Sequence, residues 1–260
     1  MDTLELGLKG KVAIVTGGSE GLGRACVERF ARCGARVALC ARRKDVLEAA
    51  ASAIRKETGA DIIARSTDVT QAAEVEAFVA EVVRTFGGVD ILINNAGTSS
   101  AAGFEAVDDQ TWLYDIELKL MAAIRFCRLV VPLMKARGGG AIVNVTTVGG
   151  KAPAARSLPT SVTRAAGINL TKSLANEYAA DGIRVNTVAL GIVKSGQWER
   201  RAKGDLDAFY QDVAKQRRIP LGRVGEASEF ADLVAFLVSE RARFITGTAV
   251  NFDGGAAAVV

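Results

Sequence analysis

The sequence of 260 residues contains no histidine. Imidazole is the usual general base of Ser/His/Asp hydrolysis and a frequent zinc ligand, so this absence excludes such hydrolases and most zinc enzymes. The sequence has only four cysteines, at positions without metal-ligand spacing, and we interpret them as small buried hydrophobic residues in a reducing compartment. We therefore expect no metal site. The cysteines are Cys26, Cys33, Cys40 and Cys127.

Long apolar segments, runs of like charge and proline-rich or serine-rich tracts are also missing. Without an apolar stretch of about 18 residues we expect no membrane span. The first ten residues lack the pattern of an export signal, which favours a cytoplasmic location. The net charge is only +4 and the basic residues are scattered, so we expect no nucleic-acid partner. No linker is visible, and 49% hydrophobic residues suit one α/β domain over residues 1–260.

Short runs rich in valine and isoleucine alternate with longer segments whose apolar residues recur at helical spacing. This pattern predicts an α/β fold: a doubly wound parallel sheet of about seven strands with helices on both faces. In such a sheet, ligands bind beyond the carboxyl ends of the strands, where the strand order reverses. A polar segment at 194–216 breaks the alternation and is a candidate substrate lid. We expect strands near 12–16, 36–40, 62–65, 91–94, 141–145, 184–189 and 249–252.

Residues 16–23 read Thr-Gly-Gly-Ser-Glu-Gly-Leu-Gly and connect the first expected strand to a helix. Glycines there permit a tight turn and a close approach of the backbone to a pyrophosphate, which the helix N-terminus attracts. Taken alone, the turn could also be an ordinary strand-to-helix loop. Further motifs follow in order: Asp68-Val69, Asn94-Asn95-Ala96-Gly97, Trp112 before a helix that ends in Pro132-Leu133-Met134, Ile142-Val143-Asn144-Val145, Ile183-Arg184-Val185-Asn186 and Phe252-Asp253-Gly254-Gly255.

Together these motifs resemble the short-chain dehydrogenase/reductase family, with its Rossmann fold, over nearly the whole chain. The resemblance implies a nicotinamide cofactor, and a small-molecule carbonyl or alcohol as substrate. It also implies a homotetramer or homodimer. The apolar residues at 121–131 and 165–174 would suit subunit faces, and they would suit burial in the core equally well. The implied cofactor residues are Gly17, Ser19, Glu20, Gly21, Leu22 and Gly23 in the turn, Asp68 and Val69 at the adenine, Asn94, Ala96 and Gly97 beside the ribose, and Gly191, Val193 and Ser195 at the carboxamide.

The end of the second expected strand favours NADP over NAD. It reads Leu39-Cys40-Ala41-Arg42-Arg43 and has no carboxylate to bind the ribose hydroxyls. Arg42 instead offers a planar fork of donors suited to a 2′-phosphate. Two points keep NAD open: both arginines could be solvated loop charges, and Glu20 stands where many NADP-using relatives carry a basic residue.

The catalytic positions depart from the family pattern. The family uses a serine to polarise the carbonyl, a tyrosine to pass the proton, a lysine to hold the ribose and an asparagine. Aligned on the motifs above, this chain has Thr147, Thr160, Arg164 and Lys119 at these positions. Thr147 keeps a hydroxyl, and Arg164 can still bind a ribose. Thr160, however, is shorter and far less acidic than a tyrosine.

A substitute acid is therefore needed, and Lys119 is our preferred choice, since the charge of Arg164 would lower its pKa. Tyr210 in the lid is a second choice, whereas Tyr178 lies too far along its helix and Tyr114 faces elsewhere. Lys119 could also be a surface or interface lysine. Three hypotheses follow: an NADP-dependent oxidoreductase, a nucleotide-binding relative without catalysis that acts as a sensor or subunit partner, and a changed chemistry such as iminium reduction or nucleophilic attack by the Lys119 amine.

Overall fold

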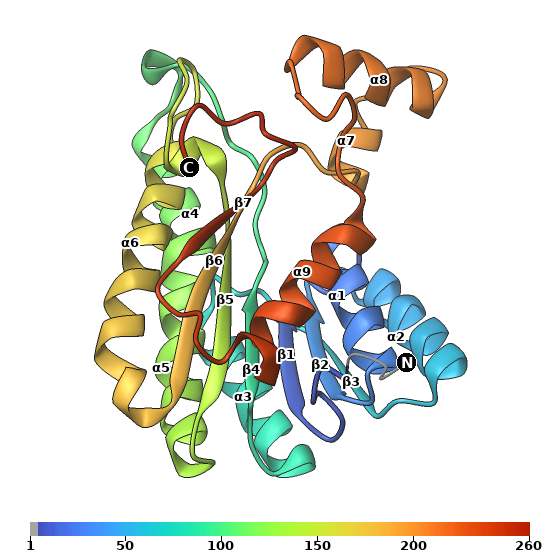
Figure 1. Ribbon diagram of the computed structural model, residues 1–260, viewed down its shortest axis with the longest axis vertical. Coiled ribbons are helices and arrows are strands. Elements are labelled where there is room, and N and C mark those ends of the chain that lie inside the picture. The colour runs from blue at the N-terminus through green and yellow to red at the C-terminus, as the bar shows by residue number, and fades with distance from the viewer. Residues whose placement is uncertain (1–4) are drawn as a thin grey trace.

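The structure of the protein, a computed structural model, describes residues 5–260. Its centre is one seven-stranded sheet in the order β3-β2-β1-β4-β5-β6-β7, and every pairing is parallel. The doubly wound sheet predicted from the sequence is therefore confirmed, as Figure 1 shows. The strands are β1 (Val12–Thr16), β2 (Arg36–Ala41), β3 (Ile62–Ser66), β4 (Ile91–Asn94), β5 (Gly140–Thr147), β6 (Ile183–Leu190) and β7 (Ala249–Phe252).

The strands agree with the expected ranges to within two residues at each end. β5 and β6 are the longest strands, with 8 residues each, because their pairing continues as far as Thr147 and Leu190. The helices between the strands are α1 (Gly21–Arg32), α2 (Lys44–Thr58), α3 (Ala72–Phe86), α4 (Asp109–Ile116), α5 (Ala122–Ala136), α6 (Thr160–Tyr178), α7 (Gly196–Glu199), α8 (Leu206–Gln216) and α9 (Ala227–Val238).

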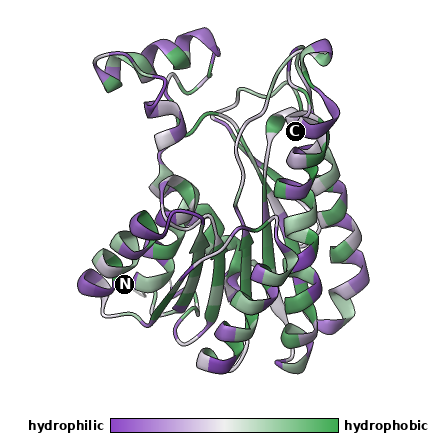
Figure 2. Cartoon of the chain, turned by 180° about the vertical axis from the view of Figure 1, so that it is seen from behind, coloured by the Kyte–Doolittle hydropathy of each residue, from purple (hydrophilic) through white to green (hydrophobic). Residues whose placement is uncertain are grey.

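Two hydrophobic cores lie on opposite faces of the sheet. Figure 2 shows the strands, coloured as hydrophobic, between the helices that cover them. On one face, α1, α2 and α9 bury residues such as Phe30, Leu47 and Phe230 against the strands. On the other face, α3 and α5 contribute Phe78 and Phe126, whose rings meet edge to face. Because both faces are covered, the strands are nearly continuous apolar runs, as the sequence pattern predicted.

α4 and α5 are joined by a π-helical segment, η2 (Glu117–Met121), that contains Lys119. Asp108 caps α4 by accepting a hydrogen bond of 2.8 Å from the backbone N–H of Thr111. Trp112 lies in α4 and therefore precedes α5, the helix near whose end Pro132, Leu133 and Met134 lie, as expected. Insertions of π-helix into an α-helix occur often at functional sites, which draws attention to this segment.

The strand order reverses between β1 and β4, which are neighbours in the sheet although α1 to α3 separate them in sequence. The glycine turn follows β1 and the segment 94–97 follows β4, so both motifs meet at the switch point. The segment 194–216 forms α7 and α8 and has a small core of its own around Tyr210 and Val213. In Figure 1 these helices lie beyond the carboxyl ends of the strands.

The cysteines are unpaired thiols, and three of them are buried as expected, whereas Cys33 is partly exposed at the end of α1. Burial raises the pKa of the Cys40 thiol to about 12, so the thiol stays protonated and unreactive at neutral pH. Between residues 5 and 260, no helix combines the length and the hydropathy needed to cross a bilayer.

Candidate active site

The turn after β1 leaves no room for a side chain at Gly18 or Gly23. A Cβ atom on Gly23 would lie 2.1 Å from the carbonyl oxygen of Gly17, and one on Gly18 would lie 2.7 Å from Leu39. Gly17 and Gly21 also have positive φ angles, which glycine adopts without strain. Ser19 is buried in this turn, and Leu22 packs against the core.

The first turn of α1 is an open site for an anion. The N-cap residue Glu20 makes no side-chain hydrogen bond to the helix, and no acidic residue follows in the first turn. The free N–H groups and the helix dipole therefore favour a negatively charged group, and the small turn lets it approach. These features fit the pyrophosphate of a dinucleotide.

The segment after β4 braces the turn. Asn95 donates from its amide nitrogen to the carbonyl oxygens of Thr16 at 2.9 Å and Gly17 at 3.2 Å. Its backbone N–H and that of Ala96 both donate to the Thr16 hydroxyl, at 3.0 and 2.9 Å. The two motifs thus hold each other in place.

Arg164 of α6 reaches this segment from the other side. Its Nη1 donates to the carbonyl oxygen of Val145 at 2.7 Å, and its Nη2 lies only 2.7 Å from where a Cβ on Gly97 would be. Gly97 is therefore needed for the guanidinium to lie beside the switch point. Burial lowers the pKa of Arg164 to about 10, partly offset by Asp115, so the side chain stays charged at neutral pH.

The residues after β3 are arranged around Asp68. Its carboxylate accepts hydrogen bonds from the backbone N–H and the hydroxyl of Thr70, at 3.0 and 2.8 Å. Val69 is buried in the core beneath it. One carboxylate oxygen of Asp68 thus fixes the loop, and the other remains for a ligand.

The two arginines after β2 have different partners. Arg43 forms an ion pair with Glu20. Arg42 donates from Nη1 to the Tyr114 hydroxyl at 3.0 Å. Glu20 argued against NADP in the sequence, but in the structure its carboxylate is paired with Arg43. Both arginines are exposed, and each has a side-chain partner.

The loop after β6 is held against the glycine turn. A Cβ on Gly21 would lie 3.5 Å from that of Ser195, and one on Gly191 would lie 2.7 Å from that of Asp253. Val193 is buried and forms a bridge with Gly225. Of the predicted residues Gly191, Val193 and Ser195, Ser195 thus lies against the turn, whereas Gly191 contacts Asp253 and Val193 pairs with Gly225.

Lys119 is the centre of a buried polar network. Its side chain is 1% exposed and forms an ion pair with Asp115, which is fully buried and lies one turn earlier. The other carboxylate oxygen of Asp115 accepts a hydrogen bond of 2.7 Å from the Thr163 hydroxyl. The interpretation of Lys119 as a surface lysine was therefore wrong.

Thr160, the first residue of α6, connects this network to the loop after β4. Its hydroxyl oxygen accepts hydrogen bonds from Lys119 Nζ at 3.0 Å and from the backbone N–H of Ser100 at 3.0 Å. With both lone pairs occupied, the hydroxyl hydrogen of Thr160 is free to donate elsewhere. Thr147 ends β5, and the short η3 (Val148–Gly150) then packs against α6 beside Arg164.

The pKa of Lys119 is lowered to about 8. Burial has the largest effect, the charge of Arg164 adds to it, and the hydrogen bond and charge of Asp115 act in the opposite direction. A lysine in this range can give up a proton near neutral pH, as a general acid must.

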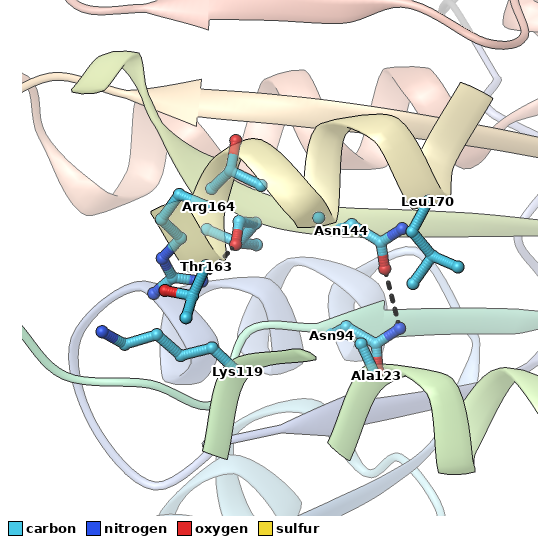
Figure 3. Close-up of a pocket in the computed structure, with 10 residues that line it drawn as sticks. Asn94, Lys119, Ala123, Asn144, Thr163, Arg164 and Leu170 are labelled. Atoms are coloured by element: carbon cyan, nitrogen blue, oxygen red, sulfur yellow. Dashed lines mark hydrogen bonds between the residues drawn. The ribbon is translucent and has the colours of Figure 1, made fainter. Parts of the chain in front are cut away.

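A cavity of about 10 Å³, with space for at most one water molecule, is lined by Lys119, Thr163 and Arg164 (Figure 3). Lys119 and Arg164 extend toward each other along it from η2 and α6. Deeper in the cavity, the Asn94 amide donates to Asn144 at 2.8 Å, and Asn144 donates to Thr171 at 2.9 Å. The amide nitrogen of Asn94 is thus committed to the core, which leaves its oxygen and backbone for the predicted ribose contact.

The three tyrosines are engaged away from this network. Tyr178 lies under the ammonium of Lys135, which is 4.8 Å from its ring centre. Tyr114 accepts the hydrogen bond from Arg42. Tyr210 is buried in α8, where its hydroxyl accepts a hydrogen bond of 3.2 Å from the Ser195 backbone N–H. Tyr210 therefore supports the loop after β6 instead of replacing the acid.

Sequence reasoning did not find Asp115, Thr163 or Ser100. The opposite charges of Asp115 and Lys119, four residues apart on an expected helix, were a signal that could have identified the ion pair. Thr163 and Ser100 gave no such signal, because they come close to Lys119 only through the packing of α6 and of the loop after β4.

A family model described as enoyl-(acyl carrier protein) reductase matches residues 17–257. The 3-oxoacyl-(acyl-carrier-protein) reductase of Staphylococcus aureus is 36% identical over 248 residues, covering 94% of this chain and 97% of the relative. The crystal structure of L-sorbose reductase from Gluconobacter frateurii, complexed with NADPH and L-sorbose, has a TM-score of 0.95 and 38% identity over 99% of this chain and 100% of that one.

A second solved structure is the NADPH-bound short-chain oxidoreductase from Pseudomonas aeruginosa PAO1, described as containing an atypical catalytic center. Its TM-score is 0.93 at 38% identity, over 96% of this chain and 98% of that one. Both solved structures are far above the similarity at which only a fold is shared.

Proposed function

Because the chain belongs to the short-chain dehydrogenase/reductase family, we propose that it is an NADPH-dependent oxidoreductase acting on a small carbonyl or alcohol. The observation that supports this most is the contact of Lys119 with Thr160, close to Arg164 and the glycine turn. Thr160 and Arg164 replace the tyrosine and lysine of the family pattern, and Lys119 replaces the asparagine.

The glycine turn and the N-terminus of α1 would hold the pyrophosphate of NADPH, and Arg164 would hold the nicotinamide ribose. Arg42 favours NADPH because it has free donors and no carboxylate competes beside it. When bound, NADPH supplies the hydride that reduces the carbonyl carbon. The NADPH in the solved structures of two relatives agrees with this assignment.

The proton reaches the substrate through Thr160. Lys119 is too deeply buried to touch a substrate directly, whereas Thr160 has a hydroxyl hydrogen left to donate. As the carbonyl oxygen gains negative charge, Thr160 gives it a proton and takes one from Lys119, which becomes a neutral amine. This route avoids forming a free alkoxide on Thr160, and Lys119 regains its proton from solvent before the next turnover.

Asp115, Thr163 and Thr147 complete the arrangement. Asp115 keeps Lys119 protonated until the reaction and fixes the direction of its ammonium, and Thr163 fixes the carboxylate. Thr147 can orient the substrate carbonyl from the end of β5. The ion pair with Asp115 argues against the Lys119 amine as a nucleophile, since a nucleophilic amine must be neutral and accessible.

Residues 194–216, with α7 and α8, act as a substrate lid over the same end of the sheet.

The chain forms a homotetramer or homodimer, and the exposed apolar residues Leu113 on α4 and Val162 on α6 support this.

The proposed function is tested by titrating the protein with NADPH and NADH and then following absorbance of the reduced nicotinamide against a panel of carbonyls. The panel includes L-sorbose and 3-oxoacyl thioesters, because relatives are named for these substrates. We expect NADPH to bind more tightly than NADH and at least one carbonyl to be reduced. Binding without turnover would favour a nucleotide-binding protein without catalysis, and no binding would refute the cofactor assignment.

The variants Thr160→Val and Thr160→Ser distinguish a proton relay from Lys119 through the Thr160 hydroxyl from a role of Thr160 in packing alone. Valine keeps the shape of threonine without the hydroxyl, so turnover should fall by a factor of about 10² to 10⁴, the usual cost of losing a positioned acid. Serine keeps the hydroxyl and should retain most of the activity. Equal activity in the two variants would contradict the relay, while NADPH binding should be unchanged in both.

A further inference from the structure

Arg42 is held in place at both ends. Its backbone carbonyl accepts a hydrogen bond of 3.0 Å from the Ser66 hydroxyl at the end of β3. Its guanidinium donates from Nη1 to the hydroxyl of Tyr114, also at 3.0 Å. The second contact joins the end of β2 to α4, although the two residues lie 72 positions apart in sequence. These contacts bring the guanidinium of Arg42 and the hydroxyl of Tyr114 together in the absence of a ligand.

The pair presents donors that suit a phosphate. A guanidinium has five N–H groups, and Tyr114 uses one, so four remain. The phenol accepts this hydrogen bond through oxygen and still has its own O–H to donate. A phosphate dianion offers only acceptors, so it can bind the guanidinium and the phenol at the same time. Tyr114 is 41% exposed and Arg42 is exposed, so both are accessible.

The charges nearby support the same ligand. The carboxylate of Glu20, which would repel the phosphate, is paired with Arg43. The charge of Arg42 therefore remains available for the ligand. Asp108 and Asp109, the acidic residues at the start of α4, lie more than one helical turn before Tyr114. Asp115 follows Tyr114 directly but pairs with Lys119 inside the protein.

We propose that Tyr114 is a specificity-determining residue of this protein, which binds the 2′-phosphate of NADPH together with Arg42 and so favours NADPH over NADH. This inference rests on the proposed function, because it assumes a dinucleotide bound along the glycine turn. The alternative is that Tyr114 only anchors a surface loop. A hydrogen bond between two exposed side chains contributes little to stability, so that alternative predicts no effect on cofactor choice.

The test is Tyr114→Phe, which removes the hydroxyl and keeps the ring. Isothermal titration is carried out with NADPH, NADH, adenosine 2′,5′-bisphosphate and 5′-AMP, so that the result does not depend on turnover. We expect NADPH and the bisphosphate to bind about tenfold more weakly, the usual effect of losing one hydrogen bond to a charged group. NADH and 5′-AMP should change less than twofold.

Tyr178→Phe is the matched control, because Tyr178 of α6 packs against Lys135 of α5 and its replacement should change none of these affinities. Arg42→Ala should abolish most of the preference for NADPH. Thermal unfolding of Tyr114→Phe should match that of the natural protein, which shows that the variant is folded.

Each outcome decides between the proposals. If Arg42→Ala loses the preference and Tyr114→Phe keeps it, the role of Tyr114 is refuted and the proposed function stands. If Tyr114→Phe weakens NADPH and NADH equally, Tyr114 contacts a part common to both cofactors and the inference is again wrong. If the natural protein binds both cofactors equally, the NADPH assignment fails together with the inference.

Discussion

The surroundings of Lys119 bring its pKa from an ordinary value of 10.5 close to neutrality. Burial and the nearby charge of Arg164 disfavour its ammonium, while Asp115 favours it, and the balance is a pKa of about 8. The proposed chemistry depends on this balance, in which burial has the largest effect and Arg164 and Asp115 act in opposite directions.

Asp115→Asn tests this balance at the residue level. The carboxylate raises the pKa of Lys119, so its removal should lower that pKa below about 8. Reduction requires the protonated amine, and the alkaline limb of kcat/KM should therefore move to lower pH. Asparagine preserves the shape, although loss of the buried ion pair should cost about 3 kcal/mol of stability.

Asp109→Asn is the matched control, because this carboxylate lies at the exposed start of α4. Its pH profile should coincide with that of the natural protein. A limb that stays in place in Asp115→Asn, with measurable turnover, would mean that the proton does not come from Lys119.

Among the elements, the turn between β1 and α1 and the interrupted helix α4-η2-α5 carry most of the site. The turn depends on local chemistry, because its glycines are needed whatever the rest of the chain does. The interrupted helix depends on its neighbours: Asp115 and Lys119 meet Thr163 and Thr160 only because α6 packs beside η2.

Gly23→Ala tests the turn. The new methyl group would lie 2.1 Å from the carbonyl oxygen of Gly17 and 2.6 Å from the amide of Asn95, so the turn and its brace must move apart. We expect NADPH affinity to fall by at least tenfold in isothermal titration. A folded variant that binds NADPH as tightly as the natural protein would show that the turn does not hold the cofactor.

This contrast explains what could be predicted from the sequence. The strands, the sheet and the glycine turn follow from local patterns, and all were predicted to within two residues or less. Lys119, Thr160 and Arg164 were identified by their spacing from other motifs. Their mutual contacts were not, because they depend on how two distant helices approach each other. The contact of Arg42 with Tyr114 could not be predicted for the same reason, because the two residues lie 72 positions apart in the sequence and meet only in the folded chain.

At the scale of the whole molecule, two exposed apolar side chains on neighbouring helices support the proposed assembly. Leu113 and Val162 are 64% and 50% exposed, and α4 packs beside α6, so both side chains lie on neighbouring helices. We expect light scattering after size exclusion to give two or four times the mass of one chain.

Leu113→Lys combined with Val162→Lys should reduce that mass, because two buried charges would oppose association. Phe244→Lys is the control: Phe244 is fully exposed after α9, at the other end of the sheet. A natural protein that elutes as a single chain would contradict the proposed assembly.

The most direct test of the account as a whole is the pH dependence of kcat/KM for carbonyl reduction by the natural protein at saturating NADPH. If Lys119 supplies the proton, the rate constant should be level at neutral pH and fall about tenfold per pH unit above its pKa of about 8. A profile that remains level to pH 10 would contradict the central claim, because Lys119 would then be largely deprotonated while the reaction proceeded unchanged.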